Sequence, residues 1–377
     1  MRRNALRVQD KLAAISAIRV LGLSLTTPFI GVALEEAYRV PLAQVSAYYV
    51  ILAAMGAAGQ VIGGLASDRA GRVRVMAFSA LTAFALLAAA TALAGSPLAL
   101  EALTSLQSFF SGSFASSSTA LVGDYFSEHA ELVKAYGRVR VGANLGWALG
   151  AVVGGSLYQL LGLRTLLAFT SLTQLSTVPL ILAIREPTPR SSMRLEAPSG
   201  PMLLFLGPSF LTFIIAGLMG YPLVYYFSVT LGMGTALGGS LLALNGALVV
   251  LLQDRVAALA SRLRPSRALA AGMTIYAIGY AILPAVRGLP EALADIALIT
   301  AGEMVALPVS SAVAARLSSP SSRGTHMGVY GLTGSVARTL SSSIFAALLY
   351  TLPPSEVWGV EAIVATASAL GYLAVLG

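Results

Sequence analysis

Long apolar stretches that are almost free of charge constrain this sequence more than any other feature. Only 11% of the 377 residues are charged, whereas a soluble domain carries about 25%, and the mean hydropathy is +0.80. A membrane-spanning helix needs about 20 predominantly apolar residues. This balance predicts an all-α polytopic membrane protein with twelve transmembrane helices, at about 12–34, 45–66, 74–95, 98–124, 139–161, 165–184, 201–228, 236–257, 268–287, 291–315, 327–350 and 357–376.

The longest polar break between these stretches is the segment 185–200, whose three prolines cannot continue a helix. It divides the chain into an N-terminal six-helix bundle (1–184), a cytoplasmic linker (185–200) and a C-terminal six-helix bundle (201–377). The basic N-terminus resembles a signal peptide, but the apolar run after it contains Arg19 and is longer than a signal core of about 7–15 residues. We therefore expect an uncleaved first spanning helix.

Lysine and arginine are distributed unevenly between the two sides of the predicted membrane. Of the 24 such residues, 18 lie on the side that carries the N-terminus and the linker, and three lie on the other side. Because cytoplasmic loops carry the excess of these bases, we expect both termini in the cytoplasm and the protein in the plasma membrane. A missed helix would scramble the alternation, so this asymmetry also supports twelve helices.

Scarce residue types exclude several kinds of site. The chain has no cysteine and two histidines, so we expect neither a disulfide nor a metal site. It has no nucleotide-binding loop, so we expect no cofactor, no direct use of ATP and no enzyme activity. The net charge of +8 comes from short bursts of bases between apolar segments, without interleaved aromatics, so nucleic acid is not an expected partner.

The two halves of the chain echo each other. The sequence LASDRAGRVRV after the second predicted helix aligns with LASRLRPSRA after the eighth when one gap is placed opposite Asp68. An internal repeat of six helices is typical of secondary transporters, which bind their substrate near the membrane midplane between the repeats. Channels and membrane enzymes have less reason to show such a repeat.

The loop after the second predicted helix resembles the best-known signature of the major facilitator superfamily. In the pattern G-x-x-x-D-R/K-x-G-R-R/K, Val73 replaces the last base, and the matching residues are Gly64, Asp68, Arg69, Gly71 and Arg72. A second signature, in the fifth helix and associated with exporters, has Ala151 in place of its proline, and its glycines are Gly146, Gly150, Gly154 and Gly155. The resemblance implies two pseudo-symmetric bundles that rock around a central site by alternating access.

The resemblance also implies roles for the charged members of the loop. In the superfamily the aspartate holds the cytoplasmic side closed by engaging the start of the eleventh helix, and an arginine pairs with an acid at the end of the fourth. Asp68 and Arg72 occupy these positions, and Asp124 is the matching acid. Gly64 permits close helix approach, and Gly71 permits the tight turn. The other interpretation of the bases is that they only set the orientation of the chain.

Three charged residues fall within predicted spans, where a charge costs about 2.5–3.5 kcal/mol and normally faces protein or a water-filled cavity. Glu303 and Arg338 lie near the midpoints of the tenth and eleventh helices, and Arg19 lies in the first. Superfamily members line their central cavity with these helices or flank it with them. We predict that Glu303 couples transport to protons and that Arg338 pairs with it; a permanent ion pair that only fixes packing is the alternative. Arg19 either contacts substrate or extends to the cytoplasmic interface.

Other polar residues at membrane depth have two interpretations. Gln107, Asn144 and Asn245 are candidates for the substrate cavity, and hydrogen bonding between helices is the alternative. Asp254 and Arg255, near the cytoplasmic end of the eighth helix, are predicted to form a gate in the second half.

Polar and aromatic residues near helix ends are assigned to the ends themselves. Asp295, early in the tenth helix, is interpreted as a first-turn acid that the helix dipole favours. Tyr226 and Trp358 lie near the outer ends of their helices, so we expect them to anchor the protein at the membrane interface.

These observations together predict a secondary active transporter for a small-molecule substrate. Proton-coupled export of small or amphipathic compounds is the leading prediction, because of the glycine signature in the fifth helix. Uptake of an organic anion by proton symport or exchange is the alternative, with Arg19 and Arg338 facing the anion. A channel or lipid scramblase is the alternative from another class. The expected partners are the substrate, protons and the lipid bilayer, and the expected state is a monomer.

Overall fold

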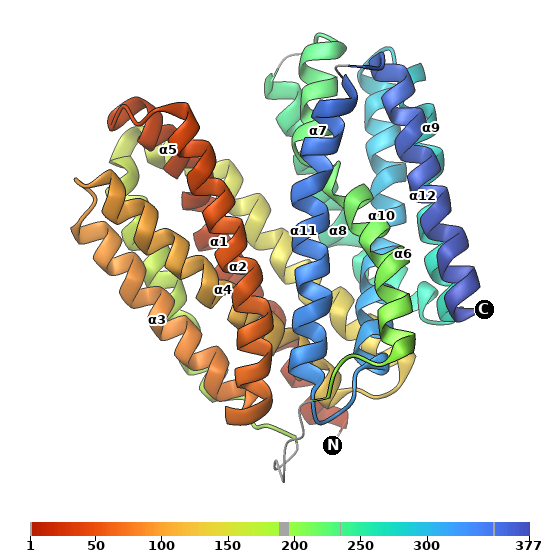
Figure 1. The fold of residues 1–377 in the computed structure, drawn as a ribbon, viewed down its shortest axis with the longest axis horizontal. Coiled ribbons are helices and arrows are strands. Elements are labelled where there is room, and N and C mark those ends of the chain that lie inside the picture. Colours follow the sequence, from red (N-terminus) through yellow and green to blue (C-terminus); the bar gives the residue numbers. More distant parts are fainter. Residues whose placement is uncertain (1, 188–195, 234, 350) are drawn as a thin grey trace. The chain divides into compact units, whose positions relative to one another are not determined.

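The structure is a computed structural model that describes residues 2–187, 196–233, 235–349 and 351–377 (Figure 1). Over this part of the chain it is built of helices and short turns, without strands. Half of the predicted linker (185–200), the segment 188–195 with Arg190 and Arg194, lies outside the described residues. By contact the chain forms two compact units: the first comprises Met1–Phe126, Arg138–Ala197 and Ser319–Leu332, and the second comprises Ser127–Gly137, Pro198–Ser318 and Thr333–Gly377.

The first unit contains the helices expected for the N-terminal bundle. They are α1 (Arg2–Val32) with its π-helical continuation η1 (Ala33–Ala37), α2 (Leu42–Ala70), α3 (Arg72–Ala92), α4 (Pro97–Tyr125) and most of α5 (His129–Leu182). Within this unit α4 packs against both α2 and α3. The first turns of α11 (Arg323–Leu349) also belong to this unit, although α11 lies far along the chain.

Local sequence explains where the helices of the first unit begin and end. Gly71 separates α2 from α3 with a φ of +113°, a conformation that residues with side chains rarely adopt. At the start of α4, the hydroxyl of Ser96 accepts a hydrogen bond of 3.3 Å from the Ala99 N–H, and Pro97 follows at the first helical position. Gly162, with a φ of +73°, breaks α5 into two helical parts that correspond to the predicted fifth and sixth helices.

The second unit contains the helices expected for the C-terminal bundle. They are α6 (Gly200–Gly217), α7 (Tyr221–Tyr225), the π-helical turn η2 (Tyr226–Thr230), α8 (Thr235–Ala260), α9 (Pro265–Ile282), the 3₁₀ turn η3 (Leu283–Ala285), α10 (Leu289–Leu317) and α12 (Pro354–Leu376). In Figure 1, α9 lies beside α12, and contacts show that it packs against both α10 and α12. The predicted seventh span is interrupted after Gly217, and the helix resumes at Tyr221.

The described chain therefore contains twelve helical spans in the predicted order. Ten helices, among the described residues, are long and apolar enough to cross a membrane by length and composition alone. The span predicted at 98–124, which the structure describes in full, falls short of that hydropathy. In α4 the reason is a series of hydroxyl-bearing and amide side chains, several of which are buried: Thr104, Ser105, Gln107, Ser113, Ser116 and Ser117. Buried polar residues inside a span indicate that this helix forms hydrogen bonds within the protein interior.

Candidate functional site

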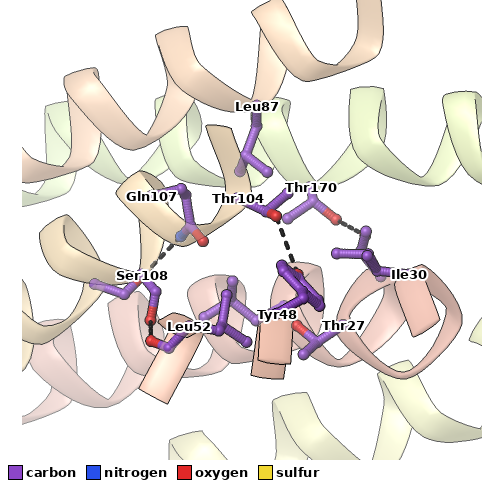
Figure 2. Close-up of a pocket in the computed structure, with 12 residues that line it drawn as sticks. Thr27, Ile30, Tyr48, Leu52, Leu87, Thr104, Gln107, Ser108 and Thr170 are labelled. Atoms are coloured by element: carbon purple, nitrogen blue, oxygen red, sulfur yellow. Dashed lines mark hydrogen bonds between the residues drawn. The ribbon is translucent and has the colours of Figure 1, made fainter. Parts of the chain in front are cut away.

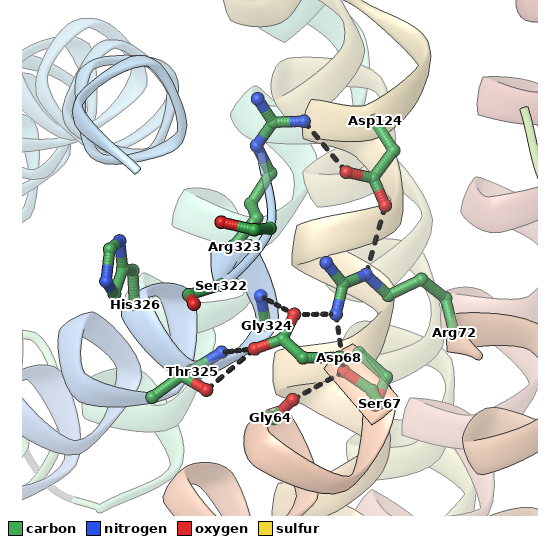
Figure 3. Close-up of polar contacts among 12 residues, drawn as sticks. Gly64, Ser67, Asp68, Arg72, Asp124, Ser322, Arg323, Gly324, Thr325 and His326 are labelled. Carbon is green, nitrogen blue, oxygen red and sulfur yellow. Dashed lines mark hydrogen bonds and ion pairs between the residues drawn. The ribbon is translucent and has the colours of Figure 1, made fainter. Parts of the chain in front are cut away.

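Asp68, the acid of the signature loop, forms hydrogen bonds with several neighbouring residues (Figure 3). It lies near the C-terminal end of α2, is 2% exposed, and accepts hydrogen bonds from the backbone N–H groups of Gly324 (2.8 Å) and Thr325 (2.7 Å). The Thr325 hydroxyl donates a third bond of 2.6 Å. The first N–H groups of a helix have no partner within the helix, and the helix dipole favours an anion there. Asp68 therefore caps α11.

Arg72, at the start of α3, links Asp68 to the end of α4. Its Nη1 atom donates to Asp68 and, at 2.8 Å, to the hydroxyl of Ser67, while its Nε atom donates to Asp124 at 3.0 Å. Arg323, the first residue of α11, donates from Nη1 to the second oxygen of Asp124 at 2.8 Å and to the Gly123 carbonyl at 2.7 Å. Two carboxylates and two guanidinium groups thus alternate. We call Asp68, Arg72, Asp124 and Arg323 the Asp68 cluster.

Arg323 is the member of the cluster that sequence analysis missed. The positive-inside rule accounts for any base in a loop, so an arginine beside α11 carried no distinct signal. The other bases of the signature loop behave as that rule suggests: Arg69 and Arg74 are exposed in the structure. The distinguishing feature is burial, since the side chains of Arg72 and Arg323 are 2% and 15% exposed.

Glycines allow the backbones around the cluster to meet. A methyl group on Gly64 would lie 2.7 Å from the carbonyl carbon of Gly324, so α2 and α11 touch there through backbone atoms. Glu186, after α5, accepts a hydrogen bond of 2.6 Å from the Val73 N–H and thereby caps the N-terminus of α3. A methyl group on Gly71 would meet that same carboxylate at 3.0 Å.

The glycines of the fifth-helix signature line one face of α5 against α1. Methyl groups on Gly146, Gly150 and Gly154 would meet the α1 backbone or side chains near Ala17, Ser24 and Leu25. These glycines recur every four residues, so they lie on one face of the helix. Gly155 lies within α5 as well. The signature therefore serves helix packing in the first unit.

Arg19 of α1 is buried in the first unit, 4% exposed. Its guanidinium carbon lies 3.8 Å from the centre of the Phe114 ring on α4. Its Nη1 atom is buried and makes no hydrogen bond to any residue that the structure describes. The positive charge of Arg19 therefore lies inside the unit, in contact with the face of the Phe114 ring.

A cavity begins one helical turn along α1 from Arg19; Figure 2 shows residues that line it. Its volume is about 140 Å³. Leu23, four residues after Arg19, and Ser111, three residues before Phe114, both line it. Most of the lining surface is apolar, and the other polar side chains of the lining are Thr26, Thr27, Tyr48, Thr104, Gln107, Ser108 and Thr170. Among the described residues these polar groups are hydroxyls and an amide, without a charged side chain.

Gln107 and Asn144, both predicted for the cavity, have different positions in the first unit. Gln107 is 5% exposed, lines the cavity, and donates to the Ser111 hydroxyl at 2.7 Å. Asn144, on α5, donates to the carbonyl of Arg140 on its own helix at 3.0 Å.

Glu303, on α10, has polar partners in the second unit. The Asn245 amide of α8 donates to Glu303 at 2.8 Å and to the Thr300 hydroxyl at 3.0 Å. Arg338 lies over the Phe213 ring, with 4.7 Å between the guanidinium carbon and the ring centre. The pairing of Glu303 with Arg338 stays a prediction.

For four other residues, the place along a helix does not predict how exposed the side chain is. Asp254 and Arg255 are exposed on α8, and their role as a gate stays a prediction. The acid in the first turn of α10 is Glu291, so the prediction of a first-turn position for Asp295 was wrong; Asp295 lies further along the helix and is 2% exposed. Trp358 is fully buried, and its role as an interfacial anchor stays a prediction. Neighbouring helices cover both residues, a fact that a helix read alone does not reveal.

Twelve helical spans among the described residues, most of them long and apolar enough to cross a membrane, define an integral, multi-pass membrane protein. Comparison with known families agrees with that class. The profile of the Major Facilitator Superfamily matches residues 12–342, and the chain belongs to this family. The predicted twelve-helix fold and the secondary-transporter class are thereby confirmed.

Individual relatives are distant. The chain is 23% identical to the uncharacterized MFS-type transporter YqjV of Bacillus subtilis over 330 residues, 83% of this chain and 79% of that protein. The human organic anion transporter MFSD10 (TETRAN) has the same fold, with a TM-score of 0.83, 17% identity, and 98% and 99% of the two chains covered. A bacterial homologue of the iron transporter ferroportin in an outward-facing state gives 0.78, 16% identity, and 98% of each chain.

Proposed function

We propose that this transporter carries a small organic anion, which Arg19 binds, and that protons are the coupling ion. The observation that supports an anionic substrate is the burial of Arg19 without an acidic partner among the described residues. Arg19 is buried and fixed against Phe114, and it has no ion pair among the described residues. Its burial also argues against extension of the side chain to the membrane interface, which would place the guanidinium in water.

A buried arginine without an acid needs an anion from elsewhere. Leaving one charge of a buried pair without its partner costs about 3–5 kcal/mol. The contact with an aromatic ring returns about 2 kcal/mol or more when it is desolvated. The difference favours binding of an anionic group beside Arg19.

The cavity next to Arg19 sets the size and polarity of the rest of the cargo. Its 140 Å³ resembles a buried cavity of about 150 Å³ that holds one benzene molecule. The hydroxyl and amide groups of Tyr48, Thr104 and Gln107 offer hydrogen bonds to a polar cargo. We therefore infer an anion with about six non-hydrogen atoms beyond its acidic group, with a largely apolar body that carries hydroxyl or carbonyl groups. The human neighbour of the same fold, described as an organic anion transporter, is in line with this charge.

We infer that the Asp68 cluster keeps one side of the transporter closed during part of the same transport cycle. We infer that its side of the membrane is cytoplasmic, where most loop bases lie, and that both termini face the cytoplasm of a plasma-membrane protein. Capping of α11 by Asp68 would then hold the cytoplasmic side closed. Export in exchange for protons, predicted from the glycine signature, is compatible with an anionic cargo.

Thermal shift of the detergent-purified protein tests the cargo. The probes are mono- and dicarboxylates of increasing size, with lipophilic cations of equal size for comparison. We expect carboxylates to raise the unfolding temperature of the native chain, Arg19→Gln to abolish that rise, and Arg19→Lys to weaken it. Arg74→Gln, at an exposed base, is the matched control and keeps the rise. Stabilisation by cations, or by anions equally in Arg19→Gln, contradicts the proposal.

Transport by reconstituted protein tests the class of activity. We expect saturable counterflow of the stabilising carboxylate into proteoliposomes preloaded with the same compound. Flux that does not saturate and shows no counterflow would indicate a channel or scramblase instead.

A further inference from the structure

We propose that Asp295 and Glu361, buried in the second unit beside Tyr280, form a proton-binding site that carries the coupling protons. The proposal rests on proton-coupled transport as proposed above, and it names residues other than Glu303 for that task. Burial, missing partners and the surrounding aromatic rings support it.

Both carboxyl groups are buried on different helices. Asp295 of α10 is 2% exposed and Glu361 of α12 is 1% exposed. Both oxygens of Asp295, and Oε1 of Glu361, are buried and make no hydrogen bond to any described residue. Because α10 and α12 both pack against α9, the two groups approach the same helix.

Aromatic side chains surround this position. Tyr280 of α9 stacks on Trp358, with 5.5 Å between ring centres, and Tyr226 lies 5.3 Å from Trp358 at a steep angle. Trp358 precedes Glu361 by one helical turn. Both carboxyl groups are close enough to Tyr280 to interact with it electrostatically. The Tyr280 hydroxyl cannot neutralise them, because it donates to the Ile215 carbonyl at 3.1 Å.

Among the other described ionisable groups near this region, one is a base: Arg287 interacts electrostatically with Tyr226, as Asp295 does. From α9 and η2 these groups are tyrosines, Tyr276 and Tyr226, and from α10 a third acid, Glu303, also interacts with Tyr280. Arg287 is exposed, and its guanidinium donates to the backbone carbonyls of Pro284 and Val286.

A proton fits this environment better than a metal ion. A carboxylate that has lost its water and gained no hydrogen bond is strongly destabilised, and binding a proton removes the charge. The neighbouring Trp358 can donate through Nε1 but has no lone pair to coordinate a cation. No group of three or more acidic, cysteine or histidine side chains in the described chain could hold a metal ion.

Glu303 differs from these two acids in its surroundings. An amide donor, Asn245, lies 2.8 Å from its carboxylate. Asp295 has no such donor among the described residues. In this conformation the buried acids without donors are the ones that hold protons, and they release them when the region opens to water.

Infrared spectroscopy of the purified protein at neutral pH tests protonation directly. We expect a carbonyl stretching band of protonated carboxyl groups that weakens in Asp295→Asn and in Glu361→Gln and is largely lost in the double variant. Glu291→Gln and Glu356→Gln, at exposed acids on the same two helices, are matched controls that leave the band intact. A band unchanged in the double variant overturns the proposal.

A second measurement needs no variant. Unfolding of the native chain at neutral pH should release protons to a pH-indicator dye, because both groups ionise once they reach water. Unfolding without proton release overturns the proposal.

Transport separates this proposal from the one it rests on. We expect Asp295→Asn and Glu361→Gln to retain carboxylate counterflow and to lose accumulation driven by a pH gradient. Unchanged gradient-driven accumulation in both variants overturns the coupling role. Absence of counterflow in the native chain refutes the anion cargo, whereas the infrared band still reports on the protons.

Discussion

Replacement of Asp68 by asparagine tests whether the cap on α11 holds the cluster together. The carboxylate accepts three hydrogen bonds from Gly324 and Thr325 and pairs with Arg72 while 2% exposed. Asparagine keeps the shape but turns one acceptor oxygen into a donor that faces other donors. Hydrogen bonds to a charged group contribute about 1.5–3 kcal/mol each, and breaking a buried pair costs about 3–5 kcal/mol.

We take about 3 kcal/mol as the lower bound for this substitution. That free energy changes the equilibrium between attached and detached α11 on the order of a hundredfold. Cysteine labelling measures the change, because the native chain has no cysteine and gives no background. Ser322, immediately before α11, is fully buried in the first unit, so Ser322→Cys reacts with a maleimide only when α11 detaches.

The expected result is a labelling rate in Asp68→Asn about two orders of magnitude above that of the native background carrying Ser322→Cys alone. Arg74→Gln removes an exposed charge six residues away and should leave the rate unchanged. If Asp68→Asn labels no faster than Arg74→Gln while remaining folded, the hydrogen bonds to α11 contribute nothing to closure, and the reasoning is refuted.

Three further changes probe packing and charge. Arg72→Lys replaces a planar guanidinium that bonds two carboxylates with a single ammonium, and calorimetry should show a loss of about 2 kcal/mol; an unchanged unfolding temperature would contradict this. Gly64→Ala places a methyl group against the Gly324 backbone and should also accelerate the cysteine labelling, whereas equal rates would exclude tight contact. Burial and then nearby Arg316 lower the pKa of His129, so folding is most stable above the usual histidine pKa of about 6.5 and weakens as pH falls through it; His129→Gln should flatten that part of the thermal-stability profile, and an unaltered slope assigns it to other groups.

Span positions were predictable because a bilayer imposes length and hydropathy on every helix. The roles of Asp68 and Arg72 depended on the resemblance, since local rules disfavour an acid at the C-terminal end of α2. A residue that breaks a local rule needs compensation from outside its helix, and the structure supplies it at α11. Arg323 follows the positive-inside rule, and the sequence therefore does not distinguish it from other bases in loops. In the structure it is a partner of Asp124.

Asp295 shows the converse case and bears on how coupling acids are recognised. The helix dipole explains a carboxylate near a helix N-terminus, so the sequence predicts no further role for Asp295. Glu303 lies at mid-helix, where a charge is costly, and Asn245 donates a hydrogen bond to it. Asp295 is as deeply buried as Asp68 and has no donor among the described residues. The two criteria, depth along a helix and the hydrogen-bond donors around the carboxyl group, therefore order these two acids differently. The proposed proton site depends on burial and on the absence of donors among the described residues, and not on depth along a helix.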